Sequence, residues 1–188
     1  MERATRWGPW ALAVIAIALM AAPAVGQELR AIPSDVESPR AIVLATYAAI
    51  AREPAKNYDW DRFRTLFLEG ALLIPNTEQT EGVFTPLSVE GFIAWVDQFT
   101  DLSPASDRGF IEGEIHRIEE RYGDIAHVFS TYEKHYWGDE TVLGRGVNSF
   151  QMVRHDGRWW ITAIIWDEPI GGEAIPDKYL PRPSPHNS

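Results

Sequence analysis

The sequence predicts an α+β fold in which helices come first and then cover one face of a curved antiparallel sheet. Apolar residues recur at helical spacing in segments between residues 38 and 102, whereas from Arg108 onward long strand-like runs alternate with turn dipeptides. Helices followed by consecutive strands are typical of this fold class. The length of 188 residues and the 45% hydrophobic content suit one globular domain.

The first 26 residues predict a signal peptide. Two arginines precede an apolar run over residues 10–22, and Ala24 and Gly26 fit a signal-peptidase site that cuts after Gly26. The alternative is an uncleaved membrane anchor, but the run is short for a bilayer span of ~20 residues. We therefore expect a periplasmic or secreted protein with no membrane attachment after cleavage.

Composition excludes several kinds of site and partner. The chain has no cysteine, so it has no disulfides, thiolate metal ligands or cysteine nucleophile. Its formal net charge of −10 repels phosphate backbones and anionic lipid. We expect neither nucleic acid nor a membrane surface as partner.

Capping signals set the start of each predicted helix. Residues 27–37 form an extended lead-in without apolar periodicity. Ser38 is a predicted N-cap with a proline at the first helical position, Asp59 caps a second short helix that stops at Gly70, and Ser88 caps a third. A short strand over residues 71–75 follows the second helix.

The second half of the chain predicts four long strands and a tail. The strand-like runs are separated by Tyr122-Gly123, Gly138-Asp139 and Asp156-Gly157, which are hairpin signals. The tail at residues 169–188 is rich in proline, with residues 175–180 as its expected docking point. The domain is predicted over residues 38–168. The predicted strands span residues 108–121, 124–137, 141–154 and 158–168.

Several segments together resemble a known fold family. They are the tyrosine-bearing first helix, DWDRFRTLF leading to a strand that ends IPN, SVEGFIAWV, and the hairpin GVNSFQMVRHDGRWWITAIIW. They resemble the nuclear transport factor 2-like superfamily, and within it the SnoaL-like and ketosteroid-isomerase-like branch, over residues 40–167. The resemblance implies a cone-shaped, cystatin-like roll: a bent sheet wraps the N-terminal helices and leaves a pocket open at one end. Members include enzymes, binders and accessory subunits, so fold alone does not give function.

The resemblance also implies roles for single residues. In the isomerase branch a first-helix tyrosine donates to an oxyanion, and Tyr47 occupies that place. A protonated acid is the second donor there, and Asn148 stands at that position with an amide that can still donate. The base of those enzymes falls at Pro75, followed by Asn76, and neither takes up a proton at neutral pH. The steroid-isomerase reaction is therefore not expected.

The hairpin turn at residues 155–157 decides which side chains face the pocket. A three-residue turn with a glycine bulge pairs Phe150 with Thr162. A two-residue turn shifts the pairing by one and puts Trp159 on the face of Met152. The inward positions of the family favour the bulged turn. The predicted inward residues are then Asn148, Phe150, Met152, Trp160, Thr162, Ile164 and Trp166.

Extending this phase by the resemblance brings two histidines inward. His116 or His127 could act as a general base, because histidine titrates near neutrality; the alternative is a hydrogen-bonded core or rim histidine. A metal site from both histidines and Glu114 is less favoured, since three ligands must converge. No metal or cofactor is expected. The further inward residues are Phe129, Thr131 and Glu133 on one strand and Ile118 on the strand before it.

The candidate site residues fall into two sets. Arg145 either binds a ligand carboxylate or, as favoured here, pairs with an acid on the sheet surface. The predicted catalytic residues are Tyr47, His127, His116 and Asn148. The predicted ligand-binding residues are Trp60, Phe67, Trp95, Phe129, Thr131, Phe150, Trp160, Thr162 and Trp166.

The last strand is apolar on both faces, so its second face also needs a cover. We expect Trp159, Ile161 and Ile165 to face outward against a second copy of the chain, as in proteins with this fold that pair through the sheet, or against the tail. The predicted function is binding of a small, largely apolar ligand in an aromatic-lined pocket. The alternatives are an acid/base enzyme of isomerase, dehydratase or hydrolase type, and a dimeric interaction module.

Overall fold

A computed structural model describes residues 29–77, 83–102, 108–169 and 174–182. The predicted signal peptide and parts of the predicted tail lie outside these residues. The elements in chain order are η1 (Pro33–Asp35), α1 (Pro39–Ile50), α2 (Trp60–Arg64), β1 (Phe67–Asn76), α3 (Val89–Leu102), β2 (Ile111–Tyr122), β3 (Ile125–His135), β4 (Gly144–His155), β5 (Arg158–Asp167) and η4 (Asp177–Tyr179).

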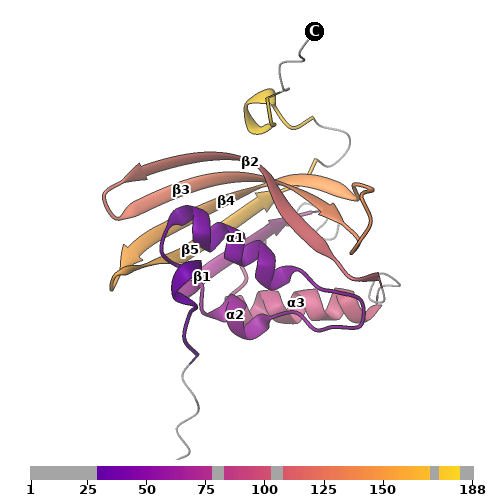
Figure 1. The fold of residues 1–188 in the computed structure, drawn as a ribbon, viewed down its shortest axis with the longest axis horizontal. Coiled ribbons are helices and arrows are strands. Elements are labelled where there is room, and N and C mark those ends of the chain that lie inside the picture. The colour runs from indigo at the N-terminus through magenta and orange to yellow at the C-terminus, as the bar shows by residue number, and fades with distance from the viewer. Residues whose placement is uncertain (1–28, 78–82, 103–107, 170–173, 183–188) are drawn as a thin grey trace, which may run out of the picture.

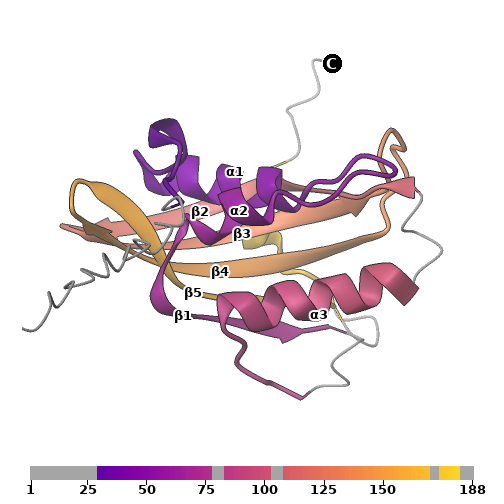
Figure 2. The ribbon, with the colours of Figure 1, turned by 90° about the horizontal axis from the view of Figure 1, so that it is seen from below.

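The five strands form one curved, unclosed sheet in the order β1-β5-β4-β3-β2. The helices α1, α2 and α3 lie on one side of it and η4 lies on the other (Figure 1). Within this layer α1 contacts β2 and β5, while α3 contacts β1 (Figure 2). The α+β prediction is confirmed. The sheet is not wholly antiparallel, because β1 is longer than the predicted strand and pairs in parallel with β5.

The first helix begins where its cap predicts. The Ser38 side chain accepts a hydrogen bond from the Ala41 amide at 3.1 Å. Asp59 likewise caps α2, but α2 ends at Arg64 rather than at Gly70. The chain leaves the helix early because it joins the sheet: the amide of Ile161 donates to the carbonyl of Leu66 at 3.0 Å.

The predicted lead-in is part of the folded domain. It holds the short helix η1, and its Asp35 accepts two hydrogen bonds from the guanidinium of Arg62, at 2.7 and 2.9 Å. The carbonyl of Val36 accepts from the amide of Trp159 at 2.9 Å. These contacts tie the segment before α1 to both α2 and β5, so an extended lead-in is wrong for residues 33–35.

The β4–β5 hairpin differs from the predicted one. Asp156 and Gly157 both have positive φ, 51° and 78°, which makes a two-residue type I′ turn. Next to the turn, Met152 pairs with Ile161, but past an irregularity in β5 Phe150 pairs with Ile164. One extra residue in β5 reverses its alternation. Near the turn, the odd-numbered residues of β5 therefore face the helices, and beyond the irregularity the even-numbered residues do.

The reversal decides which β5 side chains are in the core. Trp159 and Ile161, predicted to face outward, are buried at 2% and 0% exposure. Trp160 and Thr162, predicted to face the pocket, lie on the other face, where Thr162 donates to the carbonyl of Gln151. Beyond the bulge the prediction holds, with Ile164 and Trp166 inward and Ile165 outward at 42% exposure.

The strand β3 has the opposite phase from that predicted. Its inward residues are Ala126, Val128, Ser130 and Tyr132, all buried. The predicted inward residues His127, Phe129, Thr131 and Glu133 alternate with these on the outer face. The register of β3 against β4, which pairs Ser130 with Asn148, sets this phase. A long connection joins these strands, so no tight turn reveals the register from sequence.

A second irregularity, in β2, moves a predicted catalytic residue outward. Pairing with β3 shifts between Glu114 and His116, so the strand contains one extra residue there. Glu114 keeps the predicted inward position and reaches Ser130. His116 pairs with Thr131 instead, and the same shift carries Ile118 to the position opposite Phe129. His116 and Ile118 therefore follow the outer phase of β3.

Candidate functional site

A cavity of about 380 Å³ lies between the helices and the concave face of the sheet. Its wall is mainly aromatic, with rings from α2, α3 and β5 in contact with one another at centroid distances from 5.4 to 6.4 Å. The ring of Phe150 on β4 contacts the Tyr47 ring, with centroids 6.4 Å apart. Pockets of this size and character are typical of small-molecule sites. The aromatic wall consists of Trp60, Phe63, Phe92, Trp95, Phe150 and Trp166.

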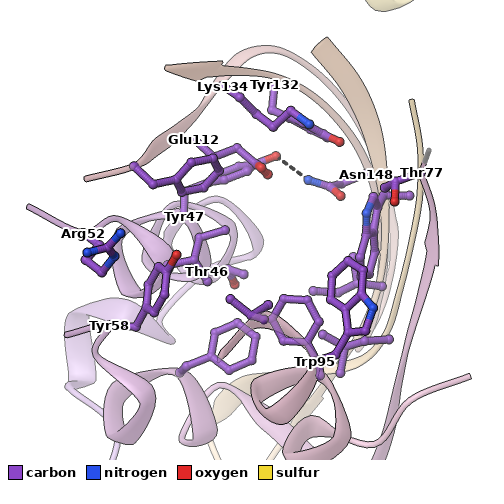
Figure 3. A pocket seen from close by; sticks show the side chains of 18 of the residues that line it. Thr46, Tyr47, Arg52, Tyr58, Thr77, Trp95, Glu112, Tyr132, Lys134 and Asn148 are labelled. Atoms are coloured by element: carbon purple, nitrogen blue, oxygen red, sulfur yellow. Dashed lines mark hydrogen bonds between the residues drawn. The ribbon is translucent and has the colours of Figure 1, made fainter. Parts of the chain in front are cut away.

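Polar groups gather at one end of this cavity (Figure 3). Figure 3 shows Glu112, Tyr132 and Lys134 along the strand side, and Asn148 pointing toward Tyr47. The Asn148 amide donates to the Tyr47 hydroxyl at 2.9 Å. The resemblance predicted these two residues as neighbours, and the structure brings them together.

A directed chain of hydrogen bonds continues from Tyr47 away from the cavity. The Ser130 hydroxyl donates to the Glu114 carboxylate at 2.6 Å, and that carboxylate also accepts from Arg117 at 3.0 and 3.1 Å. Because the single Ser130 proton is used there, the 2.7 Å contact between Ser130 and Tyr47 must be donated by Tyr47. The Tyr47 proton therefore points at Ser130, not at the cavity.

This direction bears on the isomerase-type role. An oxyanion donor must aim its proton at the ligand, whereas the Tyr47 oxygen here accepts from Asn148 while its proton is held by Ser130. Burial, together with the nearby Glu112 carboxyl, raises the pKa of the Tyr47 hydroxyl, so Tyr47 stays protonated at neutral pH. Tyr47 contributes a fixed dipole rather than a mobile proton.

Glu112 is the acidic group most altered by its surroundings. The pKa of its carboxyl is raised to about 8, mainly by burial; the charge of Lys134 opposes this rise, the neighbouring Glu168 adds to it, and a hydrogen bond from Asn148 opposes it. The residue is partly accessible, and the surface it exposes includes part of the cavity wall. Near neutral pH this carboxyl can both donate and accept a proton.

Glu112 is not among the predicted site residues, although the sequence carries a signal for it. It lies two residues before Glu114, which is predicted inward, so strand alternation puts both on the same face.

A cluster of three hydrogen-bonded polar side chains, Tyr132, Lys134 and Glu168, also lines the cavity. The Lys134 ammonium donates to both carboxylate oxygens of Glu168, at 2.6 and 2.7 Å, and the Tyr132 hydroxyl donates to the same carboxylate at 2.9 Å. Gly146 permits this, because a Cβ there would lie 2.3 Å from the Tyr132 hydroxyl. Lys134 is thus neutralised by Glu168 rather than by Glu112.

The other predicted site residues lie away from the cavity. The His127 imidazole contacts the Ser149 hydroxyl at 3.0 Å on the outer face, and Thr131 donates to the Tyr179 carbonyl at 2.5 Å. Phe129 also contacts the Tyr179 ring, with centroids 5.1 Å apart. Both histidines therefore lie on the outer face of the sheet and Glu114 lies on the inner face. The three ligands of the possible metal site are thus separated by the sheet.

The remaining predictions divide between cavity, core and surface. Trp60, Trp95, Phe150 and Trp166 line the cavity as predicted. Phe67 is in the core, packed against Phe63 at a ring distance of 4.7 Å. The cation–π contact of Trp160 with Arg158 is on the outer side. Arg145 pairs with Glu133 at 2.5 Å, which confirms the surface ion pair that was favoured.

No family model matches the chain, and no curated protein matches it. It is similar to an NTF2-like protein of unknown function from Silicibacter pomeroyi DSS-3, with 19% identity, TM-score 0.48, and coverage of 69% of this chain and 92% of that chain. A domain of unknown function with a cystatin-like fold from Nostoc punctiforme PCC 73102 gives 14% identity, TM-score 0.49, and coverage of 70% and 77%.

A third similar structure is the CaMKII hub of S. rosetta, with 16% identity, TM-score 0.44, and coverage of 59% of this chain and 82% of that chain. Four of the similar solved structures are described as NTF2-like proteins. This is the superfamily that the sequence resembles. At such identities the likeness concerns the fold alone. Within the described part of the chain, no helix is long and apolar enough to cross a membrane.

Proposed function

We propose that this protein is exported and binds a small, largely apolar molecule in the cavity between its helices and sheet. The observation that carries the proposal is the cavity itself: about 380 Å³, walled by aromatic rings, with a few polar groups at one end. Such a site buries an apolar body and orients it by a small number of polar contacts.

Neighbouring isoleucines on β5 offer a matched test. Ile164 lines the cavity at 4% exposure, whereas Ile165 points outward at 42% exposure. We expect the neutral fluorescent probe N-phenyl-1-naphthylamine to bind the wild-type protein. Ile164→Phe should weaken this binding at least about ten-fold by filling the cavity, whereas Ile165→Phe should leave it unchanged. Fluorescence titration measures both. A wild-type protein that does not bind the probe, or equal effects of both variants, contradicts the proposal.

We propose acid/base chemistry on the bound molecule as a second candidate function. The specific support is Glu112, a carboxyl on the cavity wall whose pKa burial raises to about 8. A group that is half-protonated near pH 8 is suited to proton transfer in either direction. The role first predicted for His116 or His127 passes to Glu112, because neither histidine lines the cavity.

The titration of Glu112 tests this second function before any substrate is known. In protein with ¹³C-labelled glutamate carboxyls, we expect one carboxyl resonance to titrate near pH 8. Glu112→Gln should remove that resonance, while Glu120→Gln, an exposed position on the same strand, should keep it. If Glu112 titrates in the ordinary carboxyl range, it is not an acid/base group at neutral pH and the second function fails.

A further inference from the structure

We propose that the molecule bound in the cavity carries a carboxylate and that Arg52 binds it. This inference rests on the proposed ligand-binding function and adds the chemical class of the ligand. Figure 3 shows Arg52 beside Tyr58, on the side of the cavity away from Asn148. A ligand that spans the cavity thus meets a cation at one end and the Glu112–Asn148 group at the other.

The backbone holds Arg52 at the cavity wall. Immediately after α1, Arg52 forms a bridge with Phe110, with reciprocal amide-to-carbonyl hydrogen bonds of 2.8 and 2.7 Å. Gly109 lets the two segments approach this closely, because a Cβ there would lie 2.5 Å from the Arg52 carbonyl oxygen. The side chain lines the cavity, yet the residue is only 6% exposed.

The Arg52 guanidinium is incompletely paired. One Nη donates to the Lys56 carbonyl at 3.3 Å, and the guanidinium carbon lies 5.3 Å from the centre of the Tyr58 ring. Its Nε is buried and has no hydrogen-bond partner. Over the ranges that the structure describes, no carboxylate lies within ion-pair distance of Arg52. A buried guanidinium with a spare donor is unfavourable until an anion arrives.

The other charges of the cavity wall do not compensate Arg52. Lys134 and Glu168 neutralise each other through the 2.6 and 2.7 Å contacts. Burial raises the pKa of the Glu112 carboxyl to about 8, so Glu112 is mostly uncharged at pH 7, and the cation that acts on it is Lys134. At neutral pH the described cavity wall therefore carries an excess positive charge at Arg52.

Geometry and charge favour a monocarboxylate over a phosphate. The guanidinium fork matches either oxyanion, but a dianion entering an apolar cavity needs more donors than one arginine supplies. The net charge of −10 also repels multiply charged anions. The aromatic wall then takes the rest of the molecule. The class that fits is an apolar, ring-bearing or chain-like body with one carboxylate.

A matched pair of probes tests the charge. We expect 2-naphthoate to bind the wild-type protein at pH 7 about ten- to hundred-fold more tightly than the neutral 2-naphthamide, the gain typical of a charge-assisted hydrogen bond. Isothermal titration calorimetry measures both. Equal affinities overturn the carboxylate inference while ligand binding stands. If neither probe nor N-phenyl-1-naphthylamine binds, the proposed function fails as well.

Two arginine variants assign the effect to Arg52. Arg52→Gln should abolish the preference for naphthoate and leave naphthamide binding unchanged, whereas Arg145→Gln, with the same charge change at the exposed ion pair with Glu133, should keep the preference. If Arg52 had only a structural role, Arg52→Gln would lower the melting temperature. We expect this substitution to cause no loss of melting temperature, because it removes an uncompensated charge. Should Arg52→Gln fail to fold, Arg52→Lys must reduce the preference without abolishing it. A preference unchanged in a folded Arg52 variant overturns the assignment.

Discussion

At the scale of the residue, Glu112 is held in the protonated form mainly by burial. Its carboxyl faces an aromatic cavity, and Lys134, the nearby cation, is already bound by Glu168 at 2.6 Å. In this arrangement ionisation of Glu112 would put a second negative charge near that of Glu168. The folded protein therefore binds a proton at Glu112 that the unfolded chain releases, and this links stability to pH.

The sign of that link follows from the two pKa values. The pKa of Glu112 is about 8 in the folded state against 4.5 for the ordinary group. Between these values the folded state holds more protons, so the free energy of unfolding falls as pH rises, by at most ~1.4 kcal/mol per pH unit. We expect Glu112→Gln to gain at least about 2 kcal/mol of stability relative to wild type between pH 5 and pH 8. Urea unfolding at both pH values measures this, and a constant difference contradicts it.

The family resemblance correctly placed two single residues beside each other. The Asn148 amide nitrogen lies 2.9 Å from the Tyr47 hydroxyl oxygen, and both residues occupy positions that the resemblance identifies. The direction of the Tyr47 proton could not be predicted, since it depends on Ser130 and Glu114, which come from two other strands. Arg52 was missed for the same reason: its burial arises from a bridge to Phe110, 58 positions further along the chain.

At the scale of the element, the helix starts, the order of β2 to β5 and the inward face of β4 were predictable from the sequence. The parallel pairing of β1 and the faces of β3 and of parts of β2 and β5 were not. Caps such as Ser38 are local signals, and so are the turn glycines. Successive side chains of a strand point to opposite faces of the sheet, so a single extra residue reverses which of the following residues face inward. The irregularity after Gln151 on the β4–β5 pair has no glycine or proline beside it, whereas the one after Glu114 on β2 follows Gly113, and a glycine inside a strand often marks a bulge.

These two bulges decide which side chains face the concave side of the sheet. The one in β5 lets Trp159 and Ile161 pack against the helices near the turn while Ile164 and Trp166 face the cavity further along. The one in β2 keeps Glu112 and Glu114 inside and turns His116 out. Without the bulges, each strand would present one uniform face. The bulges divide the concave side into a solid core at one end and the cavity at the other.

At the scale of the whole molecule, the outer face of the sheet is covered in part by the chain itself. The segment with η4 lies on the side opposite the helices (Figure 1), where Tyr179 contacts Phe129 and accepts a hydrogen bond from Thr131. The expected docking of residues 175–180 agrees with this position. Ile165, at 42% exposure, stays uncovered beside this segment.

The homodimer remains a prediction, with a smaller set of contacts than the sequence indicated. Of Trp159, Ile161 and Ile165, only Ile165 is on the outer face, so it is the residue to change. We expect sedimentation velocity of the chain without its predicted signal peptide to show a dimer that dissociates on dilution. Ile165→Lys should shift it to monomer, because a charge replaces apolar surface. Leu44→Lys, which alters a residue of similar exposure, 41%, on α1, should not.

Deleting residues 174–188 separates the two covers of the outer face. If a second copy and the tail both use this surface, removing Tyr179 uncovers Phe129 and should strengthen dimerisation about ten-fold or more, since the newly exposed aromatic surface becomes available to the partner. Dimerisation that is lost on deletion would instead assign the tail to the interface. A strict monomer, both with the tail and without it, rules out pairing through this face and leaves the tail as its cover.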